Sequence, residues 1–184
     1  MPPGLRKLAL VTHLTTSVGW IGAVVAYLAL DFTVSTSQDR QLVQAAWVGM
    51  DVVVSAAIVP LAIGALLTGL LMSLGTRWGL FRHWWVLISL GLTLIATLVL
   101  LSEVGVISDL AAMAADPNTS TDHLLALPGT LPHSVGGLVV LLVVQVLNVY
   151  KPPGMTPYGW RKQQEERFRQ RPTTPDPNAA DSTI

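Results

Sequence analysis

Four long apolar stretches constrain this chain more than any other feature of its sequence. They span residues 8–30, 52–74, 84–101 and 135–150. A helix needs about 20 apolar residues to cross the hydrocarbon core of a bilayer. The first three stretches have this length or nearly so, and the fourth reaches it if its helix starts near Leu131. Because period-2 alternation is absent, the sequence predicts an all-α membrane protein, a bundle of four transmembrane helices.

The composition supports this prediction and excludes several other classes. Only 12% of the 184 residues are charged, 51% are hydrophobic, and the mean hydropathy is +0.54. A soluble core of this size cannot hide so much apolar surface. The formal net charge is zero, so we expect no nucleic-acid partner. The chain has no Cys, which excludes disulfides, thiolate metal sites and iron–sulfur clusters.

The four helices are predicted near residues 8–31, 51–74, 84–103 and 132–150, within a membrane domain covering residues 1–160. The first stretch is too long for a signal peptide and has no A-x-A site, so we expect it to be retained. Segments 41–51 and 104–115 are helical in composition, which favours extension of the second and third helices beyond the membrane. Residues 161–184 are predicted to be a polar cytoplasmic tail that is disordered from residue 172 onward.

The Lys and Arg residues predict the orientation. With both termini in the cytoplasm, every basic residue except Arg40 lies on the cytoplasmic side. Basic residues, rather than acidic ones, set the topology of membrane proteins. We therefore expect a multi-pass protein of the cell membrane with both termini cytoplasmic.

One polar side chain on each helix falls at about the same depth. His13 lies six residues after Lys7, about 9 Å along the helix, and Gln145 lies six residues before Lys151. Thr68 and Ser89 fall near this level on the second and third helices. Polar side chains in a membrane are costly and are functional candidates by default. A purely structural role, in which they form hydrogen bonds between helices, is the alternative.

Helical spacing extends these positions into stripes that are predicted to face the bundle interior. Each stripe contains small and polar residues. The stripes are His13, Ser17, Trp20 and Val24; Ala57, Pro60, Gly64 and Thr68; Trp85, Ser89, Thr93, Ala96, Leu100 and Glu103; and His133, Gly137, Leu141, Gln145 and Asn148.

A second group of polar residues lies at the opposite ends of the helices. It consists of Asp31, Asp51, Glu103 and His133. Carboxylates with a histidine can bind a divalent cation. The alternative is that these helix ends are charged because they meet water.

Four segments carry a resemblance to known proteins. The first is LRKLALVTHLTTSVGWIGAVVAYLAL, in which His13 precedes Trp20 by seven residues. The others are LLTGLLMSLG, which contains Thr68-Gly69, WGLFRHWWVLISLGLTLIATLVLL and HSVGGLVVLLVVQVLNVYKPPGMTPYGWRK. Over residues 5–162 the chain resembles an uncharacterised family of actinobacterial four-helix integral membrane proteins. More distantly, it resembles the superfamily of membrane-type protoporphyrinogen oxidases and copper-resistance D domains. The resemblance implies a bacterial plasma membrane and a haem b or porphyrin site with His13 as the metal ligand.

The chain departs from the oxidases at one important position. They carry a Lys inside the third helix, where this chain has Ser89, and Glu103 stands near the place of a second His. The resemblance therefore does not extend to porphyrin oxidation, and whether the protein is an enzyme stays open.

The functional hypothesis from the sequence is a haem or porphyrin site within the bundle. Its residues are His13, as axial ligand, with Trp20, Ser89 and Gln145. His133 lies at the opposite end of the bundle from His13, so the two cannot bind one haem, and the site is expected to be five-coordinate or to have a weak second ligand. A structural or assembly subunit without a cofactor and a small transporter accessory are the alternatives. The expected partner is the lipid bilayer, and a homo-oligomer or a larger membrane complex stays open.

Overall fold

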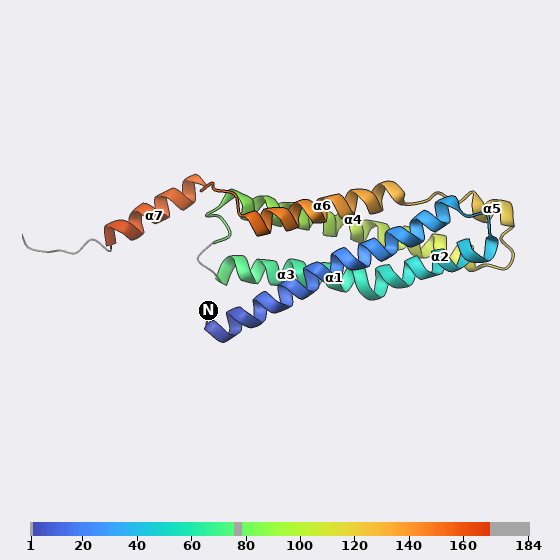
Figure 1. Ribbon diagram of the computed structural model, residues 1–184, viewed down its shortest axis with the longest axis horizontal. Helices are drawn as coiled ribbons and strands as arrows, with labels where there is room; N and C mark the ends of the chain where they lie inside the picture. Colours follow the sequence, from blue (N-terminus) through green and yellow to red (C-terminus); the bar gives the residue numbers. More distant parts are fainter. Residues whose placement is uncertain (1, 76–78, 170–184) are drawn as a thin grey trace, which may run out of the picture.

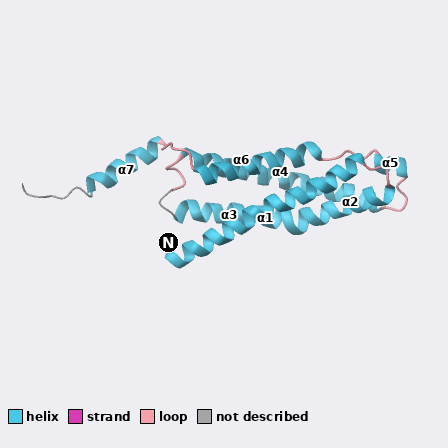
Figure 2. Ribbon diagram, viewed as in Figure 1, coloured by secondary structure: helices cyan, strands magenta, loops and turns pink. Residues whose placement is uncertain are grey.

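The computed structural model describes residues 2–75 and 79–169, and its elements are almost entirely helical (Figures 1 and 2). The elements are α1 (Pro3–Thr36), α2 (Arg40–Val53), a π-helical turn (Val54–Ile58), α3 (Val59–Gly75), α4 (Trp84–Ala115), α5 (Thr121–Leu125), α6 (Leu131–Tyr150) and α7 (Pro157–Arg169). Four helices are long and apolar enough to cross a membrane: α1, the continuous helix Arg40–Gly75, α4 and α6. The prediction of an all-α fold with four helices long and apolar enough to span a membrane is thereby confirmed.

The four spans pack as an antiparallel bundle (Figure 1). α1 lies beside α3 and α6, and α4 lies beside the same two neighbours on the other side. The short helix α5 packs on α2 at one end of the bundle, and α7 projects from the other. We call these the α5 end and the α7 end.

Three of the spans are longer than a bilayer requires. They contain 34, 36 and 32 residues, which is about 50 Å of helix, against a hydrocarbon core of about 30 Å. The extensions expected from segments 41–51 and 104–115 are present. The second helix begins earlier than its predicted membrane span, and the third helix ends later than its own. Asp39 caps the start of α2 by accepting hydrogen bonds from the backbone N–H groups of Gln41 and Leu42, at 2.9 and 3.4 Å.

The α5 end has a tightly packed core. Val43, Trp47 and Met50 of α2 and Leu124 of α5 are completely inaccessible to solvent. They pack in the same cluster as Leu110 and Ala114 of α4. The extensions are stable because α2 turns an apolar face to α4 and α5.

The predicted stripe on the second helix is wrong at Pro60, which is exposed. The buried positions are Val54, Ile58, Ala62 and Ala65 instead. Pro60 has no N–H group and its ring crowds the preceding turn. The chain accommodates it with the π-turn, in which the Val59 N–H bonds to the Val54 carbonyl, and this wider turn rotates the face that follows.

The stripe on the third helix agrees with the structure, because Trp85 and Ser89 are buried and its other members are half-buried. The fourth stripe differs at its first residue. The His133 side chain is 59% exposed, and Ser134 is buried in its place.

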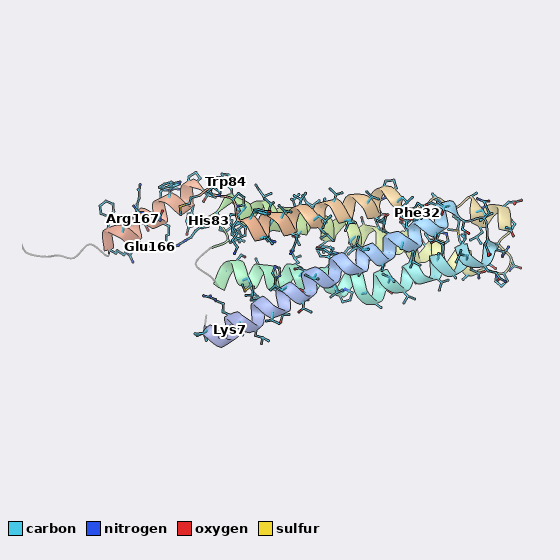
Figure 3. The ribbon with its side chains drawn as sticks, viewed as in Figure 1. Lys7, Phe32, His83, Trp84, Glu166 and Arg167 are labelled. Atoms are coloured by element: carbon cyan, nitrogen blue, oxygen red, sulfur yellow. The ribbon has the colours of Figure 1, made fainter. Side chains whose placement is uncertain are left out.

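The polar segment after the fourth span forms the helix α7. At its start, the Thr156 N–H donates to the Arg82 carbonyl at 3.0 Å. Gly159 lies so close to the Arg82 backbone that a Cβ atom there would be 2.4 Å from the Arg82 oxygen. Glu166 accepts a hydrogen bond from the Arg82 guanidinium at 2.5 Å, and Figure 3 shows Glu166 on α7, the helix that projects beyond the start of α4. The predicted disorder from residue 172 lies outside the described residues.

Candidate functional site

A cavity of about 410 Å³ lies among the four spans in the half of the bundle nearest the α7 end. Its walls come from α1, α3, α4 and α6. All four predicted site residues line it, namely His13, Trp20, Ser89 and Gln145. Its volume falls within the range of small-molecule sites, about 300–1,000 Å³.

The His13 side chain reaches across from α1 to α3. Its Nδ1 lies 3.0 Å from Thr68 Oγ1, and the Thr68 hydroxyl in turn donates to the Gly64 carbonyl at 2.6 Å. A hydroxyl has one proton, so Thr68 accepts from His13, and Nδ1 carries the imidazole hydrogen. In the neutral imidazole, Nε2 then carries the lone pair that can bind a metal.

Gly69 makes room for the imidazole. A Cβ atom at this position would lie 3.1 Å from His13 Cε1, which is closer than most real Cβ contacts. Sequence reasoning placed Thr68 at the correct depth but gave Gly69 no role at the site. The adjacent pair Thr68-Gly69 was the available signal, because a small residue beside a hydrogen-bonding one permits close approach of a third side chain.

Ser89 brings an unpartnered polar atom to the cavity wall. The residue is 5% exposed, and its Oγ has no hydrogen-bond partner within the part of the chain that the structure describes. Leaving a buried hydroxyl without a partner costs about 1–3 kcal/mol. At the wall of a cavity, such a hydroxyl can bond to a molecule that occupies the cavity, either water or a ligand.

Two large apolar residues close the cavity on the side of the α5 end. Trp20 is 4% exposed and Leu141 is 6% exposed, and both line the cavity. Gln145 and Asn148, one and two turns further along α6, are half-buried and line the cavity as well. The polar groups of the site are therefore separated from the α5 end by apolar packing.

Beyond this apolar layer, the second predicted group of polar residues has a different arrangement from the one expected. Asp31 does not meet water, because it is completely buried. Its carboxylate accepts hydrogen bonds from the Thr130 N–H at 3.0 Å, the Thr130 hydroxyl at 2.9 Å and the Ser134 hydroxyl at 2.8 Å. The Tyr27 hydroxyl donates to Thr130 Oγ1 at 2.7 Å. Asp31 thus anchors the start of α6 to α1.

The other members of that group do not join Asp31 in a metal site. Asp51 accepts a hydrogen bond from the Ser108 hydroxyl at 2.6 Å, and Glu103 Oε1 lies 4.0 Å from His133 Nε2. Across residues 2–75 and 79–169, no group of three or more His, Asp or Glu side chains is arranged to hold a metal ion.

The residue types around the cavity are those that could hold a porphyrin. His13 offers an imidazole, the surrounding Leu, Ile, Val and Trp side chains offer apolar walls, and Ser89 offers a hydroxyl that has no partner in the described structure. Arg82 is paired with Glu166, so its guanidinium already has a carboxylate partner within the protein.

The fold and the cavity define a class, that of multi-pass helical membrane proteins with an internal cavity between the spans. Comparison with known proteins gives no closer placement, because no protein-family model, no curated protein and no solved structure matches the chain.

Proposed function

We propose that the protein binds haem b, or a closely related porphyrin, in the cavity between its spans, with Nε2 of His13 as the axial metal ligand. One observation carries the proposal: Thr68 holds the His13 ring by Nδ1 at the wall of a cavity that also contains the unpartnered Ser89 hydroxyl. A metal-bound histidine is usually oriented in this way, by a hydrogen bond from its other nitrogen.

The residues around the site have different roles. Thr68 fixes the tautomer and the plane of the imidazole, and Trp20 and Leu141 exclude water from the side of the α5 end. A bound haem would supply electron transfer or the binding of a small molecule at the iron.

None of the other three histidines, all of which the structure describes, lines the cavity. His123 lies in α5 and His133 at the start of α6, both at the far end of the bundle. His83 immediately precedes α4, with its ring centroid 6.4 Å from that of Trp85, and it does not line the cavity. We therefore expect one strong axial ligand.

The test is the absorption spectrum of the protein purified after expression with ample haem. We expect a Soret band in the natural protein and its loss in His13→Ala. His123→Ala is the matched control, because it removes an imidazole that is exposed and distant from the cavity, and it should leave the band unchanged. A colourless natural protein, or a band that survives in His13→Ala, would contradict the assignment.

A structural or assembly subunit without a cofactor is the second candidate. The His13–Thr68 hydrogen bond favours it, because it links α1 to α3 and partners the imidazole without any ligand. The same spectrum separates the two functions. The third hypothesis, a transporter accessory, has less support, because Trp20 and Leu141 interrupt the polar groups at mid-bundle.

We further propose that both termini lie in the cytoplasm and that the membrane is a bacterial plasma membrane. The distribution of Lys and Arg supports the orientation, and the resemblance to actinobacterial membrane proteins supports the location. The apolar side chains exposed along all four spans support contact with lipid, and they leave room for a homo-oligomer or a membrane complex.

A further inference from the structure

The half of α1 nearest the α7 end is poorly covered by the rest of the bundle. From Pro3 to Gly19 no residue is buried, whereas five residues are buried from Trp20 onward: Trp20, Val24, Tyr27, Asp31 and Val34. Figure 1 shows the same divergence, since α1 approaches α6 towards the α5 end and separates from it towards its own N-terminus.

The separation leaves one side of the cavity open. Leu10 and Leu14 of α1 and Val149 of α6 line the cavity, yet they are 44%, 49% and 64% exposed. Leu10 and Leu14 flank His13 in the sequence and belong to an apolar membrane span, so they meet lipid rather than water. The opposite end of the cavity is closed by Trp20 and Leu141.

The remaining walls are amphipathic. Gln145, Asn148 and Lys151 follow one another at intervals of three residues at the end of α6, and all three line the cavity. They form a polar wall that ends in the cationic Lys151. At the same depth, the wall that α1 contributes consists of the apolar Leu10 and Leu14. This arrangement is complementary to a molecule with an apolar body and an anionic end.

We infer that the ligand of this cavity is a membrane-dissolved amphiphile with an anionic end, and that it enters from the lipid by passing between α1 and α6. The inference rests on the proposed function for the ligand's identity, since a porphyrin with its carboxylates belongs to this class. The entry route of the ligand is inferred from the packing of α1 and α6 alone. The divergent half of α1 is held to α3 by His13 and Thr68, but it has no buried residue against α6, so it is the α6-facing side of this wall that opens.

The route can be tested without any ligand, because the natural chain has no Cys. In Ser17→Cys, a nitroxide spin label attached to the single thiol would report from the cavity wall in vesicles. Val11→Cys, at an exposed position of the same span that does not line the cavity, is the lipid reference, and Gln38→Cys in the connection after α1 is the water reference. We expect the label at residue 17 to collide with oxygen as the residue 11 label does, and rarely with a water-soluble nickel chelate. Collisions with the chelate at the level of residue 38 would overturn the lipid route.

Uptake of hemin from vesicles gives the second measurement. Leu14→Trp fills the open side and should slow the appearance of the Soret band about tenfold, equivalent to about 1.4 kcal/mol of barrier. Val11→Trp adds the same bulk outside the cavity and should leave the rate unchanged. Loading of Leu14→Trp at the natural rate would contradict the route. If the natural protein takes up no hemin at all, the proposed function fails, while the spin-label result still decides the route.

Discussion

The two nitrogens of the His13 imidazole have different surroundings, and this difference determines what the residue can do. Nδ1 is held by Thr68 at 3.0 Å, on the side of α3. Nε2 carries the lone pair. A histidine that only joined two helices would need one of these nitrogens, so the Thr68 contact by itself supports either proposed function. A purely structural role for His13 does not explain why the Ser89 hydroxyl has no partner in the described structure.

Thr68→Val tests how far the orientation of His13 matters. Valine keeps the shape of threonine but cannot accept the imidazole hydrogen. We expect haem retention to fall about tenfold or more, as for other groups that orient a metal ligand. The free energy of unfolding in detergent should fall by about 1 kcal/mol, as for other hydrogen bonds between membrane helices.

The control for this prediction is Thr97→Val on α4. Thr97 is buried, whereas Thr68 is half-buried; the Thr97 hydroxyl donates to the Thr93 carbonyl of its own helix, and Thr97 does not line the cavity. This variant should retain haem normally. Equal haem retention in Thr68→Val and the natural protein would show that Thr68 does not orient the ligand.

At the scale of the elements, α1 and α6 are joined firmly at one end and weakly at the other. The joint at the α5 end is the Asp31 carboxylate, which accepts three hydrogen bonds from Thr130 and Ser134. Thr130 immediately precedes α6, so the carboxylate also lies where the helix dipole favours negative charge. The half of α1 nearest the α7 end can therefore diverge from α6 without loss of the fold.

Asp31→Ala should disrupt this joint. It leaves the buried N–H and hydroxyl of Thr130 without their acceptor, while the Ser134 hydroxyl keeps the Leu131 carbonyl at 3.1 Å. Each group without an acceptor costs about 1–3 kcal/mol, so we expect the free energy of unfolding to fall by at least about 2 kcal/mol, measured by denaturation in detergent. Asp109→Ala, at an exposed position of α4, should change it by less than about 0.5 kcal/mol. A similar, small effect of both changes would show that the Asp31 network is not what holds α6.

Some of these elements could be predicted from the sequence and others could not. Hydropathy located all four spans, because the bilayer requires long apolar helices whatever their neighbours are. The rotation at the π-turn before Pro60 was missed, because a regular helical period was assumed through it. The burial of Asp31 was missed because its partner Thr130 lies 99 residues away, and no local pattern indicates that contact. Likewise, the depth of His13 followed from counting residues, but its hydrogen bond to Thr68 did not.

At the scale of the whole molecule, the two ends differ in packing and in charge. The α5 end has the inaccessible core of Trp47, Met50 and Leu124, and the only basic residue that the sequence assigns to that side is Arg40. The α7 end has the open cavity, and the other basic residues that the structure describes lie on its side. A rigid half and an open half suit a protein that holds its shape from one side of the membrane while admitting a ligand near the other.

Reporter fusions test the proposed orientation of the whole molecule. Because cytoplasmic loops retain Lys and Arg, alkaline phosphatase fused after Asp39 or Asp116 should be active, and a fusion after Gly79 should be inactive. A green fluorescent protein at the same three positions is the control, and it should fluoresce only after Gly79, since it folds poorly when exported unfolded. Asp39 and Asp116 lie at the α5 end, immediately before α2 and immediately after α4, so the two fusions must agree with each other. Phosphatase activity after Gly79 together with fluorescence after Asp116 would reverse the orientation, and would place the open half of the cavity in the outer leaflet.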